Sequence, residues 1–239
     1  MGQRYIAFDL ETAKVLPESV VDLLDHRPLG IACAAAVATG REDAIVWHGL
    51  AAGKPSAQMS REEVRAMVSD LAAWVQDGYT LVSWNGLAFD FNILAEESNR
   101  PEECANLALV HVDMMFHAVC KLGHYVSLAK AAEALGIPGK ASSMSGSDAP
   151  MMWAEGQHEK VLGYNVQDAR LTLRVAEESE RRGQLTWVTR RGTTRSMPLE
   201  RGWQCVGEAC HIPLPDTSWM SDPPTRERAL NWLPPSCRP

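Results

Sequence analysis

Residues 5–12 have the sequence YIAFDLET, and this stretch decides the expected fold. Alternate side chains of a strand point to the same face, so Asp9 and Glu11 lie together while the apolar side chains at positions 6, 8 and 10 face a core. Two adjacent carboxylates repel each other. The usual reason for keeping them together is a bound divalent cation, which prefers hard oxygen ligands. The alternative is that the two acids only mark the exposed end of a strand.

Two further strands are predicted at residues 31–38 and 44–49, and they extend residues 5–12 into an antiparallel meander. Ser60 and Glu63 form a capping box that opens a helix. That helix is the expected crossover to another buried strand at residues 80–84, parallel to the first. Further helices are predicted at residues 91–95, 128–135 and about 159–182. The expected fold class is therefore α/β, with a mixed central sheet flanked by helices.

The domain with this sheet is expected to span residues 1–183, with a loop rich in Ser and Gly at residues 138–150. Residues 184–239, called here the C-terminal extension, have a different character. A β-hairpin is predicted at residues 185–199. The Pro-rich tail that follows carries three tryptophans, which are expected to dock it onto the domain: Trp203, Trp219 and Trp232.

Two more motifs carry acids downstream of the first strand. Residues 84–90 (WNGLAFD) lie between a predicted strand and a predicted helix, so Asp90 is at a junction from which a loop-borne carboxylate can reach the sheet edge. Tyr164 and Asp168 are four residues apart in the long helix and therefore share one face.

Together, Asp-x-Glu on a first strand, Asn-Gly-x-x-Phe-Asp and Tyr-x-x-x-Asp on a late helix resemble the three motifs of the DEDD 3′–5′ exonucleases. The tyrosine is typical of the DEDDy subgroup, whereas the position of the histidine subgroup's general base is Gly163 here. The resemblance covers residues 4–182. Within these exonucleases, the sequence is similar to the proofreading domain of family B DNA polymerases and to stand-alone predicted exonucleases of that type. The resemblance implies a ribonuclease H-like fold.

The resemblance also implies roles for individual residues. Two divalent ions, Mg²⁺ or Mn²⁺, would be held by Asp9, Glu11, Asp90 and Asp168, with Asp9 shared by both ions. Tyr164 would orient the attacking water, because a phenol with a pKa near 10 is a poor base. These five residues are the predicted catalytic set.

Three residues are predicted to contact the terminal nucleotides: Thr12, Asn85 and Phe89. An aromatic stack on a base is a reasonable role for Phe89, and packing of its ring into the core is an equal alternative. For Asp113 a structural role is preferred over a place in the site.

The predicted activity is hydrolysis of single-stranded or frayed nucleic acid from its 3′ end, releasing nucleoside 5′-monophosphates. The motifs do not decide between DNA and RNA, because discrimination of the 2′-hydroxyl depends on pocket geometry; DNA is placed slightly ahead. Two alternatives stay open: a catalytically inactive nucleic-acid-binding or scaffold protein on the same fold, and an internal-cutting RNase H-like nuclease.

Composition agrees with an ordinary globular protein, with 46% hydrophobic and 22% charged residues. A membrane partner is not expected, since no apolar run approaches the ~20 residues of a spanning helix. The N-terminus shows no signal-peptide pattern, and the six cysteines fit a reducing cytoplasm.

The net charge of −7 favours a short single-stranded end over a long duplex. Six arginines after the long helix either follow a phosphate backbone or are ordinary surface residues: Arg181, Arg182, Arg190, Arg191, Arg195 and Arg201.

Overall fold

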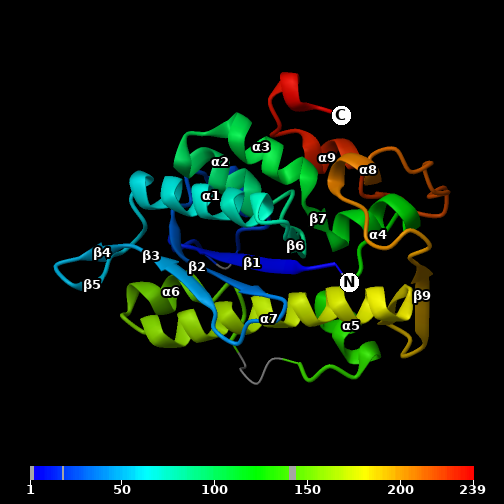
Figure 1. Cartoon of the computed structure of the whole chain (residues 1–239), viewed down its shortest axis with the longest axis horizontal. Helices are drawn as coiled ribbons and strands as arrows, with labels where there is room; N and C mark the ends of the chain where they lie inside the picture. Colours follow the sequence, from blue (N-terminus) through cyan, green and yellow to red (C-terminus); the bar gives the residue numbers. More distant parts are fainter. Residues whose placement is uncertain (1–2, 18, 140–143) are drawn as a thin grey trace.

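The computed structural model describes residues 3–17, 19–139 and 144–239. A five-stranded mixed sheet with the order β3-β2-β1-β6-β7 lies between two layers of helices (Figure 1). Its strands are β1 (Tyr5–Thr12), β2 (Ile31–Ala38), β3 (Ile45–His48), β6 (Thr80–Ser83) and β7 (Val112–Asp113). A short separate hairpin joins β4 (Leu50–Ala51) to β5 (Lys54–Pro55). The expected α/β class with a mixed central sheet is confirmed.

Helices α1, α2 and α3 cover one face of the sheet, while α5, α6 and α7 cover the other (Figure 1). The helices of the first 183 residues are α1 (Arg61–Gln76), α2 (Asp90–Ser98), α3 (Pro101–Val110), α4 (Met114–Leu122), α5 (Leu128–Leu135), α6 (Ala149–Ala154) and α7 (His158–Arg182), with the 3-10 turn η1 (Leu23–His26). Among the described residues, no helix is long and apolar enough to cross a bilayer.

Strand β1 divides its side chains between the two layers as its alternating pattern predicts. Ile6, Phe8 and Leu10 are buried in the core that includes residues of α1 and α2. Tyr5 and Ala7 are buried in the second core, which includes residues of α7. Asp9 and Glu11 continue this second face, so both carboxylates are directed to the side of the sheet that α7 covers.

The pairing of β1 leaves space beside its carboxyl end. It is antiparallel to β2 from Ile6 to Thr12, but parallel to β6 only from Tyr5 to Ala7. The predicted meander and the predicted parallel strand are therefore both confirmed. Because β6 ends opposite Ala7, the backbone of β1 beyond that residue is open to other partners on this side.

Several elements are not predicted from the sequence, among them β7 and α6. Strand β7 has only two residues, too few for a recognisable alternation. Helix α6 begins at Ala149, inside the segment expected to be a loop, and its Pro150 stands in the first turn, where a proline costs no hydrogen bond. Within that expected loop, residues 140–143 lie outside the described residues.

The C-terminal extension begins with the predicted hairpin, β8 (Gln184–Val188) and β9 (Thr194–Pro198), followed by α8 (Val206–Ala209), α9 (Arg226–Leu230) and the 3-10 turn η2 (Pro235–Cys237). Two tryptophans of the tail make hydrogen bonds to distant parts of the chain. The indole N–H of Trp203 donates to the Ala176 carbonyl at 3.0 Å, and that of Trp232 to the Leu87 carbonyl at 2.7 Å. Trp219 is 67% exposed and donates to the Asp216 carbonyl within the tail, while its ring lies 6.3 Å from that of His124.

Candidate active site

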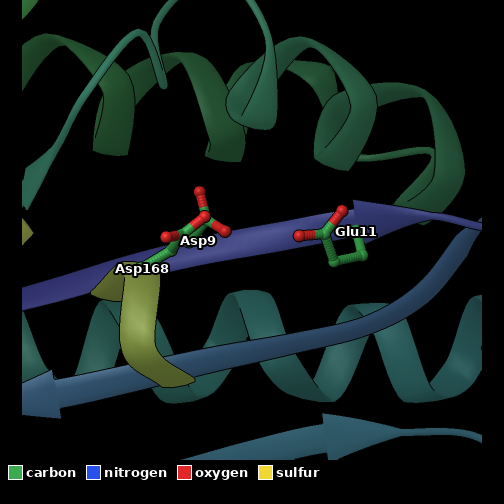
Figure 2. Close-up of side chains that lie close together, drawn as sticks. All are labelled: Asp9, Glu11 and Asp168. Atoms are coloured by element: carbon green, nitrogen blue, oxygen red, sulfur yellow. The ribbon is translucent and has the colours of Figure 1, made fainter. Parts of the chain in front are cut away.

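Three carboxylates from distant parts of the chain meet between the sheet and α7. One oxygen each of Asp9, Glu11 and Asp168 lies within 4.8 Å of the others, as Figure 2 shows for their side chains. Glu11 is 6% exposed and Asp168 9% exposed. Asp9 is half-buried, so the strand end that carries these acids is covered and not fully exposed.

The donor set of this cluster fits a hard divalent cation. Carboxylate oxygens are the ligands that Mg²⁺ and Mn²⁺ prefer. Three carboxylates this close, in a site largely removed from water, repel one another strongly unless positive charge compensates them. The cluster can therefore hold a divalent metal ion through Asp9, Glu11 and Asp168.

Tyr164 lies one helical turn before Asp168 and is 4% exposed. Burial raises the pKa of its phenol, and the negative charges of Asp168 and Glu11 and the hydrogen bond to Asp168 raise it further. The hydroxyl therefore keeps its proton next to the carboxylates, where it serves as a hydrogen-bond donor.

Asp90 lies beside this cluster but does not belong to the group of three. It begins α2 and is 5% exposed, and its Oδ1 accepts the backbone N–H of Leu10 at 3.1 Å. The N–H of Leu10 is free to make this bond because the pairing of β1 with β6 stops at Ala7. Burial is the main cause that raises the pKa of Asp90, and the charge of Asp113 adds to it. Because Leu10 separates Asp9 from Glu11 in sequence, Asp90 borders the site at the sheet edge.

Asp113 has a structural task at the same edge. Its carboxylate accepts the backbone N–H groups of Asn85 (3.0 Å), Leu87 (2.9 Å) and Phe116 (3.0 Å). These bonds hold the loop between β6 and α2 and cap α4. They also hold Asn85 at a φ of 73°, in the left-handed region that asparagine tolerates better than most residues.

The three predicted nucleotide-contacting residues occupy different surroundings. Thr12 is buried at the end of β1, after an irregularity in its pairing with β2. Phe89 is half-buried and packs against the core beneath α2. Asn85 lines a cavity of about 220 Å³ at the carboxyl edge of β6 and β7. Their contacts with a nucleotide stay predictions.

Asn165 is a site residue that the sequence analysis missed. Its side-chain N–H donates to Asp9 Oδ2 at 2.7 Å, and the residue is fully buried. Its Oδ1 has no hydrogen-bond partner among the described residues. The available signal was its spacing: Asn165 precedes Asp168 by three residues, so both lie on the same face of α7.

The sequence matches the family model described as RNase_H superfamily over residues 40–179, more than half of the chain. This match includes Asp90, Tyr164 and Asp168, and it begins after β1. The structure is similar to that of the family B DNA polymerase from the hyperthermophilic archaeon Pyrobaculum calidifontis, with a TM-score of 0.54 and 18% identity over 75% of this chain. The chain covers 25% of that polymerase chain, and the likeness concerns the fold. No curated protein matches this sequence significantly.

Proposed function

This chain belongs to the RNase H superfamily, and we propose that it is a metal-dependent 3′–5′ exonuclease of the DEDDy type acting on single-stranded or frayed ends. The observation that carries the proposal is the meeting of Asp9 and Glu11 on β1 with Asp168 on α7. Tyr164 lies one turn from Asp168, as the tyrosine subgroup requires. The fold is one that nucleases use, but a fold alone does not define an activity.

The proposed cofactors are two divalent ions, Mg²⁺ or Mn²⁺. When bound, they supply activation of the attacking water and neutralisation of the charge on the attacking and leaving oxygens. Asp9, Glu11 and Asp168 would hold them, with Asp90 reaching the same site from the sheet edge. A carboxylate set on two rigid elements keeps its oxygens fixed without reorganisation during the reaction.

Other residues of this chain position the reacting groups. Asn165 donates to Asp9 Oδ2 and so sets the orientation of that carboxylate. Tyr164 keeps its proton next to Asp168 and Glu11, so we assign it the orientation of the attacking water and not the removal of its proton. The products would be nucleoside 5′-monophosphates and a strand shorter by one nucleotide.

The proposed substrate is a nucleic acid with a free 3′ end, with DNA placed ahead of RNA. The six cysteines are all free thiols, which supports a reducing compartment, and we propose the cytoplasm. A single digestion of matched DNA and RNA strands decides directly whether DNA or RNA is the preferred substrate.

The decisive experiment uses 5′-labelled oligonucleotides with Mg²⁺ or Mn²⁺. We expect a ladder of products shortened from the 3′ end, and protection when that end is blocked. Cleavage of a circular or 3′-blocked strand would instead identify an internal-cutting nuclease. A folded protein that binds Mn²⁺ but cuts neither DNA nor RNA would refute the exonuclease proposal. An Asp168→Asn variant serves as the inactive control.

A further inference from the structure

Exposed arginines gather on the hairpin of the C-terminal extension. Four lie on or beside β8 and β9: Arg190, Arg191, Arg195 and Arg201. In the described part of the chain, none of these four has a carboxylate within ion-pair distance. Arg181 and Arg182, just before the hairpin, differ because both bind Glu178 at 2.7 and 2.6 Å. The hairpin is therefore a local positive surface on a protein whose net charge is −7.

Aromatic side chains lie next to the hairpin. Arg195 is paired directly opposite Trp187 across the two strands. The ring of His124 lies 6.1 Å from that of Trp187 and 6.3 Å from that of Trp219, measured between centroids. Trp219 is 67% exposed, and Tyr125 is 57% exposed. Two large aromatic side chains thus face solvent where an ordinary surface would carry polar residues.

One of these exposed aromatic residues also lines the cavity next to the candidate active site. Tyr125 lines the cavity of about 220 Å³ that Asn85 also lines, and α9 of the extension forms part of its wall. Asn85 adjoins Gly86, and a Cβ atom at Gly86 would lie 3.6 Å from Asp90 Oδ2. Asp90 in turn contacts the backbone of β1 between Asp9 and Glu11. Tyr125 therefore shares a cavity with Asn85, whose loop leads to Asp90.

Exposed aromatic rings and unpaired arginines are the two components that proteins use to hold single strands. Bases stack on the rings irrespective of their sequence, and arginines bind the phosphates between them. A duplex hides its bases and offers nothing for the rings to stack on. The combination consequently fits a single strand better than a duplex.

We propose that this arginine–aromatic surface, defined as Arg190, Arg191, Arg195, Tyr125 and Trp219, binds the single-stranded part of the substrate upstream of its 3′ end. The direction of the strand rests on the proposed exonuclease function, whereas binding itself does not. The C-terminal extension then supplies substrate affinity to a site that is itself acidic.

The binding test uses the full chain in EDTA, so that no turnover occurs, with fluorescein-labelled oligo(dT) of 20 or 4 nucleotides. The test variant is Arg191→Ala/Arg195→Ala. The matched control is Lys54→Ala/Arg61→Ala, which removes the same charge from exposed residues outside the surface. We expect the test variant to bind the 20-mer more weakly, with a salt dependence shallower by about 1.4 in the log–log slope. Trp219→Ala should weaken binding by about 5-fold or more.

A separate turnover assay distinguishes the two proposals. The p-nitrophenyl ester of thymidine 5′-monophosphate has no upstream strand, so all variants should hydrolyse it at the wild-type rate. If the test and control variants bind the 20-mer equally well, the surface proposal is overturned and the activity result still stands. If the surface variants lose 20-mer binding but the wild type hydrolyses neither substrate, the surface is supported and the exonuclease function is refuted.

Discussion

Asn165→Leu separates a site role from a packing role for the residue beside Asp9. The substitution removes the hydrogen bond to Asp9 Oδ2, and a bond to a charged group contributes about 1.5–3 kcal/mol. It also removes a fully buried amide oxygen that has no partner among the described residues, and leaving such a group unsatisfied costs about 1–3 kcal/mol. The two effects nearly cancel, so we expect the free energy of unfolding to change by about 1 kcal/mol or less.

The effect on the site should be much larger than the effect on stability. Loss of a partner that orients a metal ligand typically lowers metal affinity or activity by about 10–100-fold. We would measure urea unfolding in EDTA by tryptophan fluorescence, Mn²⁺ affinity by calorimetry and the rate of oligonucleotide digestion.

Ser179→Ala is the matched control for this prediction. Ser179 is also fully buried on α7 with an unpartnered hydroxyl, but it lies 14 residues further along the helix, about 21 Å away. It should leave Mn²⁺ affinity and activity unchanged. A loss of about 3 kcal/mol in Asn165→Leu with unchanged Mn²⁺ affinity would refute our reasoning and make Asn165 purely structural.

Three further predictions concern catalysis, metal and pH. Tyr164→Phe should lower the turnover number by about 10²–10⁴, and Asp9→Ala should lower it more because it removes the proposed shared ligand; a fully active Asp9→Ala protein would mean that the site is elsewhere. Removal of metal with EDTA should abolish activity and lower the melting temperature, since the carboxylates then repel one another, and added Mn²⁺ should restore both. Burial lowers the pKa of His111 and of His117 to about 4, from an ordinary value of 6.5. The unfolded chain then binds more protons, so stability is fully present above pH 6.5 and is lost as the pH falls toward 4, by roughly 3 kcal/mol per residue at most. The raised pKa of Asp90 acts in the opposite direction, so the loss is measured as the difference in urea midpoints between pH 7 and pH 4.5 for the wild type against His117→Gln. The wild type should lose more stability than this variant, and equal losses would contradict the prediction.

Local sequence patterns predicted most of the fold because their physical causes are local. The alternation in residues 5–12 requires one buried and one acidic face, and the structure has both. Ser60 caps α1 through its hydroxyl and Glu63, as the motif predicts. The spacing of Tyr164 and Asp168 puts both on the buried face of α7. The roles assigned to these residues in catalysis stay predictions.

Where local signals are weak or misleading, sequence patterns do not decide the local structure. Pro150 favours a loop when it is taken alone, yet it lies in the first turn of α6. Trp219 has the same size and apolar character as Trp203, but only Trp203 finds a buried carbonyl for its indole N–H. Whether a tryptophan docks depends on the surface that it meets, and no pattern around the residue records that surface.

The sequence by itself determined the strand and helix pattern and the faces on which Asp9, Glu11 and Asp168 would stand. Only the tertiary structure decided that Asn165 reaches Asp9 across 156 positions of sequence, and that Asp90 occupies the open side of β1 at Leu10. It also decided that the ring of His124 lies beside both Trp187 of the hairpin and Trp219 of the tail. Local backbone preferences act within a few residues, whereas these contacts depend on how separate elements pack, and packing is settled by the whole core at once.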